Sequence, residues 1–299
     1  MNKRERWFNE GAPHLRRTLE AVGLGKLLPD GDFYMCPCCL IAYPRGALLD
    51  ETLTEEHVPP RGLGGRGMLL TCKGCNNKAG HYFDSHAIKR LKVLEFIMGR
   101  GASRTLRATF HADGVPLRGE VTRAGSGILM QGVPKQNDSR VVEDHERALM
   151  RSRGFQFTIT EQFTARLADI SWVRSAYLAA FSAFGYRYIF QPALDPIRAQ
   201  LKDPDAEILP SLVGFNPDAP ASGRSVNLVR SPDDLQGVLV IMGHYSVMLP
   251  DPWGTLSCQE LAAAIGRRTD SEGRLEIMCD GQIAPWPQSP AYRLDLEAE

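Results

Sequence analysis

The chain has 299 residues, 43% of them hydrophobic and 23% charged, and its 35 Lys and Arg residues balance its 35 Asp and Glu residues. These values are ordinary for a soluble globular protein, and the length allows one large domain or two to three small ones. No apolar run approaches the roughly 18 residues that a membrane-spanning helix needs. The charged N-terminus, MNKRERWFNEG, lacks the apolar core of a secretory signal, so we expect a cytoplasmic protein without a membrane partner.

The charges are distributed unevenly along the chain. Residues 1–110 contain 17 Lys and Arg against 11 Asp and Glu, whereas residues 111–299 contain 18 against 24. A basic front half suits a polyanionic partner and an acidic rear half does not. The distribution therefore favours a nucleic-acid contact in the first part of the chain.

The first hundred residues contain two predicted helices around a cysteine-rich stretch. Residues 3–28 keep roughly one apolar face, which predicts a helix, and residues 33–36 (FYMC) predict a short strand. After the cysteine-rich stretch, residues 85–98 have an apolar face again and predict a helix that ends at Gly99 and Gly101.

The middle of the chain changes from strands to a long helix. Residues 104–134 show partial alternation and Gly-containing turns, which predicts two or three antiparallel strands. A polar, turn-rich segment, 134–140, is a candidate linker. A short helix over 141–151 and a strand over 155–159 are expected next. An apolar and aromatic stripe then predicts a long core helix over 160–184, with Thr160 as its cap.

The last third is predicted to mix strands and short helices. Residues 192–202 predict a helix, and residues 203–235 are rich in Pro, Asp and Ser and are expected to be irregular. Residues 237–250 predict a strand pair that breaks at Gly243-His244. A short helix over 257–267 and a last strand over 275–281 complete the expected elements.

Four of the seven cysteines form two CxxC pairs, Cys36-Cys39 and Cys72-Cys75. In a chain without an export signal this pattern favours a metal over disulfides. Two such knuckles complete a closed tetrahedral site, which is typical of structural zinc. Cys38 leaves an ambiguity, because it could replace Cys36 or Cys39 as a ligand or be a spare thiol. The remaining two, Cys258 and Cys279, are expected to be buried apolar residues.

The 32 residues between Cys39 and Cys72 exceed the minimal zinc-ribbon spacing, so we expect a functional insert there. The insert carries Glu56-His57 directly before two prolines, then a basic, glycine-rich loop (61–67) and a second strand (68–72). On a regular strand Glu56 and His57 would point to opposite faces. A bend or the end of the strand would let both side chains reach one centre.

The pattern CPCC…EEHVPP…LTCKGCNNKAG resembles the HNH endonucleases, the ββα-metal nuclease superfamily, and in particular their bacterial branch with CxxC pairs and an EHVPP-type motif. The resemblance covers about residues 33–90. It implies that His57 is the general base and that Glu56 and Asn76 hold a catalytic divalent ion. The chemistry agrees, because an imidazole can accept a proton near neutral pH and carboxylate and amide oxygens suit Mg²⁺ or Mn²⁺.

The sequence departs from the family pattern at two places. Many members have an Asn in the loop before the second strand, where this chain has Arg66-Gly67-Met68. Some members carry a second helical His four residues after the first helix ligand, where this chain has Gly80. Asn77 and His81 have the i, i+4 spacing instead, and Asp84 lies one turn further on. Any of these three could supply the third protein ligand.

Three basic residues near the expected centre are candidate contacts for backbone phosphates: Arg61, Lys73 and Lys78. Ordinary surface charge explains each of them equally well.

Together these features predict an α+β protein with a zinc-stapled ββα-metal (HNH) domain, followed by a mixed helix and antiparallel-strand C-terminal domain. The expected segments are 1–30 (helical), 31–100 (HNH nuclease), 101–140 (β-rich connector) and 141–299 (α+β, of unknown role). The predicted function is Mg²⁺- or Mn²⁺-dependent cleavage, most readily of double-stranded DNA.

By analogy with bacterial defence nucleases, the C-terminal domain is expected to bind a partner protein or a second copy of the chain. The alternative is a zinc-knuckle module that binds nucleic acid or protein without catalysis. That alternative explains the cysteines. It does not explain Glu56-His57 before the prolines, or the Asn after Cys75.

Overall fold

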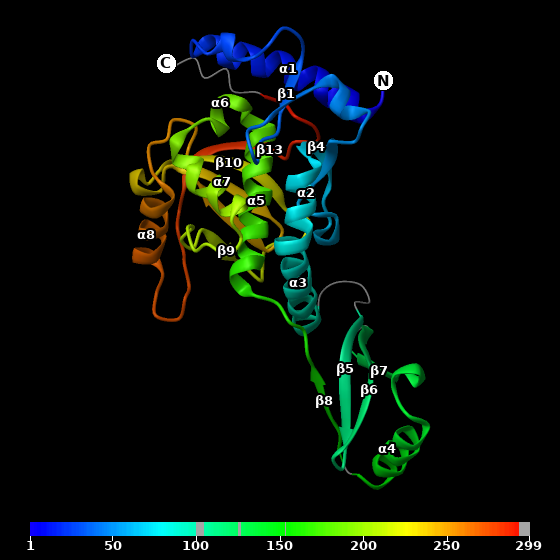
Figure 1. The fold of residues 1–299 in the computed structure, drawn as a ribbon. Helices are drawn as coiled ribbons and strands as arrows, with labels where there is room; N and C mark the ends of the chain where they lie inside the picture. The colour runs from blue at the N-terminus through cyan, green and yellow to red at the C-terminus, as the bar shows by residue number, and fades with distance from the viewer. Residues whose placement is uncertain (100–104, 125–126, 153, 293–299) are drawn as a thin grey trace. The chain divides into compact units, whose positions relative to one another are not determined.

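The computed structural model describes residues 1–99, 105–124, 127–152 and 154–292 (Figure 1). They form two compact units: residues 1–85 together with the chain from Arg166 onward, and residues 86–165 between them. The boundaries of the two units differ from those of the four predicted segments, because the part after Arg166 packs with the first 85 residues. The four-segment division into domains stays a prediction.

The unit of residues 86–165 is built on a four-stranded antiparallel sheet. Its strands are β5 (Thr105–Ala112), β6 (Val115–Ala124), β7 (Gly127–Gly132) and β8 (Gln156–Ile159), in the order β7-β6-β5-β8. Every second residue of β5 is buried, as expected for a strand with one face on a core. Helix α4 (Ser139–Arg151) belongs to this unit, as does α3 (Ser85–Met98) from His86 onward. The structure agrees here with the predicted strands and both predicted helices.

The other unit begins with α1 (Lys3–Ala21), β1 (Phe33–Met35) and β2 (Ala42–Pro44). Asn2 and Glu5 form a capping box at the start of α1. The helix ends at Ala21, earlier than predicted, and the apolar residues that follow are exposed rather than part of a buried face. The buried side of α1 packs with β1 and with the next hairpin in one core, formed by Trp7, Phe8, Ala12, Tyr34, Ala47, Leu53 and Leu70.

The next hairpin consists of β3 (Leu53–Val58) and β4 (Arg66–Cys72), paired antiparallel. Helix α2 (Lys73–Ala79) follows β4 directly, and a π-helical turn (Gly80–Asp84) joins it to α3. The chain therefore has the expected order of strand, loop, strand and helix. The predicted second strand is two residues longer at its start, because Arg66 and Gly67 pair with Val58 and His57.

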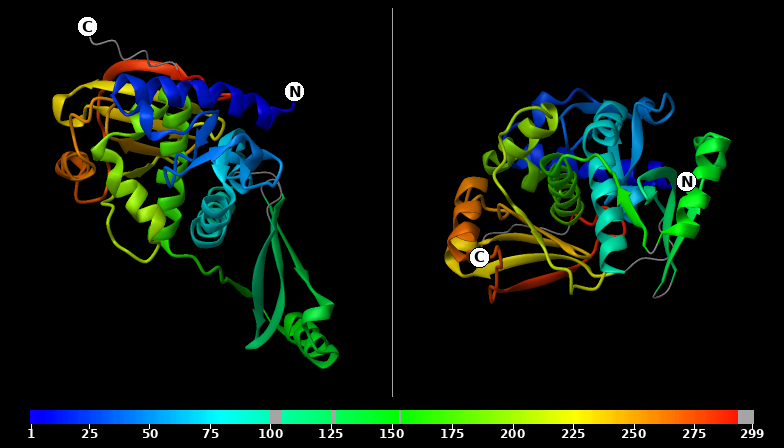
Figure 2. Two further views of the ribbon diagram at one scale, coloured as in Figure 1. Left: turned by 45° about the horizontal axis from the view of Figure 1, so that its top comes forward. Right: turned by 90° about the horizontal axis from the view of Figure 1, so that it is seen from below.

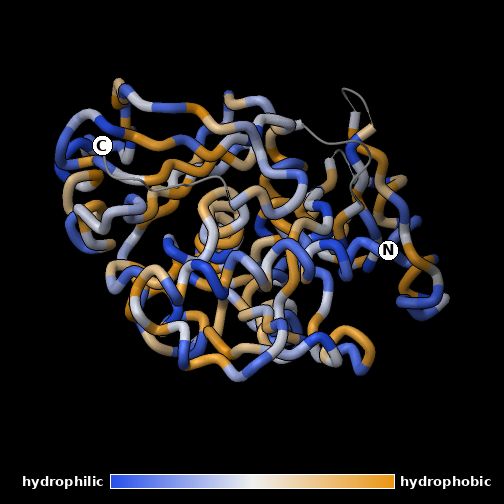
Figure 3. The backbone as a smooth tube through the Cα atoms, turned by 90° about the horizontal axis from the view of Figure 1, so that it is seen from above, coloured by the Kyte–Doolittle hydropathy of each residue, from blue (hydrophilic) through white to orange (hydrophobic). Residues whose placement is uncertain are grey.

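The last third forms a five-stranded antiparallel sheet in the order β13-β10-β11-β12-β9. The strands are β9 (Val213–Phe215), β10 (Arg224–Ser231), β11 (Gly237–Met242), β12 (Tyr245–Leu249) and β13 (Asp280–Pro285). Hydrophobic residues follow the strands (Figure 3). The predicted pair β11–β12 is present. The prediction of an irregular 203–235 is wrong, because β9 and β10 lie there, and the last strand begins at Asp280 rather than at residue 275.

Short helices α6 (Tyr186–Ile189), α7 (Asp195–Lys202) and α8 (Cys258–Arg268) complete the same unit. The fold is thus mixed α+β, with antiparallel sheets and helices, as predicted. None of the helices in the described part of the chain is long and apolar enough to cross a membrane.

Helix α5 (Ala165–Phe184) lies between the β3–β4 hairpin and the terminal sheet (Figures 1 and 2). It begins five residues later than predicted, and every residue from Ile170 to Phe184 is buried. Toward the sheet, Trp172 stacks on Tyr245 of β12 with ring centroids 4.2 Å apart. Toward the first cysteine pair, the hydroxyl of Tyr177 donates to the carbonyl of Pro37 over 2.7 Å. The helix is therefore the shared core of the unit.

We expect Tyr186→Phe to destabilise the protein by about 1–3 kcal/mol, because a buried hydroxyl then leaves two backbone groups unpaired. The Tyr186 hydroxyl accepts from the amide of Met35 (3.1 Å) and donates to its carbonyl (3.0 Å). Urea denaturation measures the change. Tyr82→Phe is the control, because Tyr82 is exposed, and equal midpoints for the two variants would contradict the prediction.

Candidate functional site

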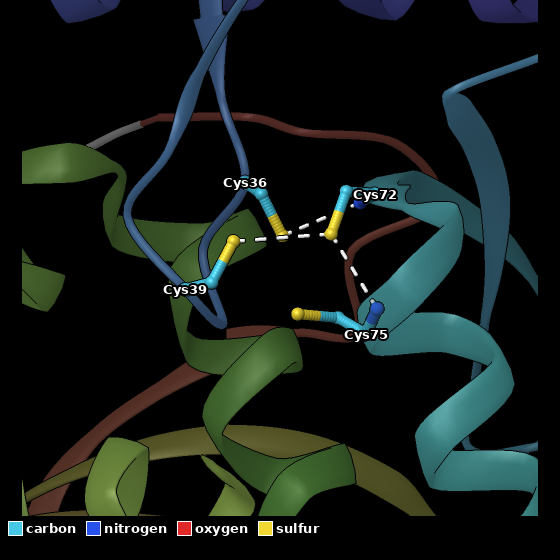
Figure 4. A group of neighbouring side chains, drawn as sticks. All are labelled: Cys36, Cys39, Cys72 and Cys75. Carbon is cyan, nitrogen blue, oxygen red and sulfur yellow. Dashed lines mark hydrogen bonds between the residues drawn. The ribbon is translucent and has the colours of Figure 1, made fainter.

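Four cysteines come together between β1 and α2. Cys36 and Cys39 lie on the turn after β1, Cys72 ends β4 and Cys75 lies in the first turn of α2 (Figure 4). Their four Sγ atoms all lie within 4.8 Å of one another. The Sγ atoms of Cys39 and Cys72 are 3.8 Å apart. Four sulfurs about 2.3 Å from a zinc ion form a tetrahedron with edges of about 3.8 Å, so the cluster fits a zinc ion.

Backbone amides support the negative charge that these sulfurs need as metal ligands. The amide of Cys72 donates to Sγ of Cys36 (3.3 Å), and the amide of Cys75 donates to Sγ of Cys72 (3.4 Å). The pKa of Cys72 is lowered, because its Sγ accepts hydrogen bonds from Cys36, Cys39 and Cys75. The thiolate is the form that binds metal. The structure thus brings the four predicted ligands together, and their role as zinc ligands stays a prediction.

Cys38 is buried next to this cluster. Hydrogen bonds with Cys36 and Cys75 lower its pKa, and the charge of Arg174 adds to that effect. Within the described residues, the group of mutually close sulfurs does not include Cys38. This favours the spare-thiol alternative. Of the two remaining cysteines, Cys258 is buried as expected, whereas Cys279 is partly exposed.

The β3–β4 pairing is interrupted between Glu56 and His57. Glu56 lies opposite Leu69 and His57 opposite Gly67, so Met68 is an extra residue on β4. Such a bulge re-aims the side chains beside it and is common next to active sites. Glu56 is only 3% exposed and faces the interior, whereas His57 is partly exposed.

The imidazole of His57 makes no hydrogen bond or ion pair with any described residue. A histidine that is partly exposed and unpartnered can take up a proton from water. Its position at the end of β3, before Pro59, is the position expected for the general base.

Gly65, in the loop between β3 and β4, and Gly67, on β4, both lie very close to neighbouring atoms. A Cβ at Gly65 would lie 1.4 Å from the carbonyl oxygen of Pro59, and one at Gly67 would lie 1.5 Å from Oε1 of Glu55. The loop is also tied from outside, because Nη2 of Arg224 on β10 donates to the carbonyl of Gly64 over 2.7 Å. Arg224 therefore holds the loop, which is the role that many HNH members give to an Asn.

Both carboxylate oxygens of Glu56 have protein partners. Arg174 of α5 donates through Nη1 to Oε1 (3.3 Å) and through Nη2 to Oε2, and the hydroxyl of Thr71 also donates to Oε2 (2.8 Å). Arg174 is 2% exposed. Burial lowers the pKa of Arg174, but the neighbouring Glu56, Cys38 and Asp84 raise it by more, so the guanidinium stays charged. The sequence offered no motif for this partner, which lies 118 residues away.

The predicted helix ligands separate into two groups. Asn76 is half-buried, and its Nδ2 donates to Oγ1 of Thr54 (3.1 Å) and to the carbonyl of Glu55 (3.2 Å). Asp84 is buried and accepts from the hydroxyl of Ser171 on α5 over 2.7 Å. Asn77 and His81 are exposed.

The π-helical turn explains this separation. Eight α-helical steps of about 100° each would place Asp84 about 80° away from Asn76. The turn between them adds one residue without the usual rotation, which reduces the difference to about 20°. Asp84 therefore lies on nearly the same side of the helix as Asn76, and the spacing of Asn77 and His81 selects a different side.

A catalytic divalent ion does not fit the expected ligands in this conformation. Magnesium and manganese need carboxylate oxygens that are open to them. Both oxygens of Glu56 accept from Arg174, Oε2 also accepts from Thr71, and Oδ1 of Asp84 accepts from Ser171. The assignment of Glu56, Asn76 and a third helix residue as ion ligands stays a prediction.

The basic residues near the hairpin differ in their surroundings. Arg61 and Lys73 are exposed, whereas Nζ of Lys78 donates to the carbonyl of Lys202 over 2.9 Å. Arg66 and Arg224 form a pair of like charges beside the loop. Burial and the charge of Arg66 together lower the pKa of Arg224. An anion bound there would relieve their repulsion, and the sequence had not indicated either residue as a phosphate contact.

Residues 45–92 match the HNH endonuclease family. The matched stretch contains the whole β3–β4 hairpin, α2, the π-helical turn and the first half of α3. The predicted resemblance is thus confirmed for this stretch, which we call the HNH segment. The match implies nuclease-type chemistry, metal dependence and a nucleic-acid ligand. The comparisons with curated proteins and with solved structures gave no match.

We expect the purified protein to contain about one zinc ion per chain and Cys72→Ser to lose most of it, because three sulfurs leave the tetrahedral site open. Metal analysis by mass spectrometry measures the content, and thermal denaturation measures the accompanying loss of stability. Cys279→Ser is the matched control, because Cys279 lies outside the cluster. Full zinc content in Cys72→Ser would contradict the prediction.

Proposed function

We propose that the chain is a metal-dependent HNH endonuclease that hydrolyses phosphodiester bonds, most readily in double-stranded DNA. The observation that carries the proposal is the position of His57 within the HNH segment. The family match and the hairpin coincide there, and His57 is partly exposed on the face of β3 opposite to the buried Glu56.

His57 would act as the general base. Hydrolysis needs a water that loses its proton while its oxygen attacks phosphorus, and the unpartnered imidazole can accept that proton. The divalent ion of this family, Mg²⁺ or Mn²⁺, would supply positive charge at the scissile phosphate when bound. The four-cysteine cluster would hold zinc as a closed structural site, because all four ligands come from the protein.

Basic side chains around the hairpin would contact the phosphate backbone. Arg61 and Lys73 are exposed and so are available to a polyanion, and Arg66 and Arg224 add two charges beside the loop. Lys78 is tied to the carbonyl of Lys202 and would have to release it. Double-stranded DNA as the ligand, a cytoplasmic location and a role in bacterial defence are parts of the proposal, and so is a partner or second copy at residues 141–299.

One observation favours a second function, a zinc module that binds nucleic acid or protein without catalysis. The carboxylate expected to bind the divalent ion is paired with Arg174 in the interior. A chain that has lost metal binding could keep the zinc cluster and the basic surface. Cleavage assays with wild type and a His57 variant distinguish the two functions.

We expect His57→Ala to lower the rate of DNA cleavage by about 10²–10⁴-fold, because the attacking water loses its proton acceptor. The assay follows nicking of plasmid DNA in Mg²⁺ or Mn²⁺, with single-stranded DNA and RNA as further substrates. His111→Ala is the control, because His111 lies on β5 outside the HNH segment. Absence of cleavage by wild type on every substrate would favour the non-catalytic function.

We expect Arg66→Ala to weaken DNA binding on all sequences and to reduce the slope of log K against log salt by about 1, because one phosphate contact is lost. Binding is measured by fluorescence anisotropy at several salt concentrations. The His57→Ala background prevents cleavage during the titration. Arg267→Ala is the matched control, because Arg267 pairs with Asp234 far along the chain from the hairpin. An unchanged slope would exclude Arg66 from the phosphate contacts.

A further inference from the structure

We propose that Arg174 is an internal cation of the HNH segment: its guanidinium takes the place of a divalent ion at Glu56, and an ion binds there only after α5 has withdrawn it. The inference rests on the proposed function insofar as Glu56 is the expected ion ligand. In this proposal, the described conformation is a resting state in which the nuclease centre does not bind a divalent ion.

The first support is the occupancy of the Glu56 carboxylate. The guanidinium contacts both oxygens, Oε1 through Nη1 and Oε2 through Nη2, and the Thr71 hydroxyl fills a further acceptor position. Glu56 and Arg174 are both almost fully buried. A two-pronged contact of this kind uses the same lone pairs that a metal ion would use. Arg174 therefore competes with an ion for the oxygens of Glu56.

The second support is that α5 faces both carboxylates of the centre. Ser171 lies three residues before Arg174, on the same side of the helix, and its hydroxyl donates to Asp84. The hydroxyl of Ser175 instead donates to the carbonyl of Ser171 within α5. One face of α5 thus supplies a partner to Glu56 of β3 and to Asp84 of the π-helical turn.

The third support is the balance of charge in the interior. Glu56 and Asp84 are two buried carboxylates, and Arg174 is the cation whose charge interacts with both. Buried carboxylates require a compensating cation, which can be a guanidinium or a metal ion. A guanidinium and a divalent ion together would repel each other at this short range. The site holds one cation at a time.

The consequence is a physical route from the terminal sheet to the HNH segment. Trp172 lies two residues before Arg174 on α5. Trp172 stacks on Tyr245 of β12, whereas Arg174 contacts Glu56 of β3. A shift of α5 that withdraws Arg174 must also move Trp172 against the sheet. The predicted ion ligands would become available only in that shifted state.

The test measures Mn²⁺ binding to the zinc-loaded full chain, without nucleic acid, by the electron paramagnetic resonance signal of free Mn²⁺. We expect Arg174→Met to bind one more Mn²⁺ per chain than wild type. At this site its affinity for Mn²⁺ should be at least ten-fold higher than that of wild type. The double variant Glu56→Gln/Arg174→Met should lose that gain. Arg268→Met is the matched control, since Arg268 also pairs with a carboxylate, that of Asp234.

Two results would overturn the proposal. One is a folded, zinc-containing Arg174→Met protein that binds no additional Mn²⁺. The other is a wild-type protein whose Mn²⁺ affinity falls when Glu56→Gln is introduced, because Glu56 would then be open to metal already. If Arg174→Met does not fold, the comparison of wild type with Glu56→Gln decides, and equal Mn²⁺ binding supports the proposal.

Failure of the proposed function would look different. A gain of Mn²⁺ in Arg174→Met without cleavage of any nucleic acid by either protein would sustain the internal cation and remove the nuclease. Cleavage that depends on His57, with Mn²⁺ binding unchanged by Arg174→Met, would sustain the nuclease and remove the internal cation.

Discussion

The buried ion pair between Glu56 of β3 and Arg174 of α5 is the contact on which the larger unit depends. Both side chains are nearly inaccessible, at 3% and 2% exposure. Removal of one partner of such a pair costs about 3–5 kcal/mol, because the other charge remains buried without compensation. The same helix stacks on the terminal sheet through Trp172, and its Tyr177 donates to the carbonyl of Pro37, which lies between the first two cysteines of the cluster. The hairpin, the cysteine cluster and the terminal sheet are therefore packed around one helix, which the ion pair joins to the hairpin.

Within the HNH segment, the position of His57 results from several constraints at once. The cysteine cluster fixes the start of α2 against the turn after β1, and Asn76 fixes α2 to β3. Glu56 and His57 follow the regular alternation of β3, so that Glu56 points inward while His57 remains accessible, and the extra residue Met68 shifts the pairing on β4. Gly65 permits this path, because a side chain there would collide with the backbone of Pro59, whereas a side chain at position 67 would displace the side chain of Glu55. The residues around His57 therefore fix its position, and its own side chain needs no hydrogen bond to do so.

Local patterns in the sequence predicted the elements whose partners are near in the chain. The strands over 105–132 and the bounds of α3 follow from alternation, turns and helical spacing. The resemblance to the HNH endonucleases follows from two cysteine pairs and a Glu-His dipeptide, and the family match covers the dipeptide and the second pair. In contrast, β10 was missed although Ser225-Val226-Asn227-Leu228 alternates polar and apolar residues and its neighbour β11 follows closely, because Pro, Asp and Ser residues surround it; its second partner, β13, lies some fifty residues later. Arg174 was also missed, although an arginine in the middle of the most apolar helix already requires an acidic partner.

Arg174 differs from a metal ion in being attached to the chain, and this decides how the centre would be controlled. A tethered cation has an effective concentration at Glu56 that is set by the packing of α5 and not by the solution. A free divalent ion must compete with that fixed concentration, so a moderate rise in ion concentration changes the balance little. A weakened contact between Trp172 and Tyr245 would change it more, because it loosens the helix that holds the guanidinium. Control of the HNH segment would then act through the terminal sheet, which gives a physical role to a part of the chain that the family match does not reach.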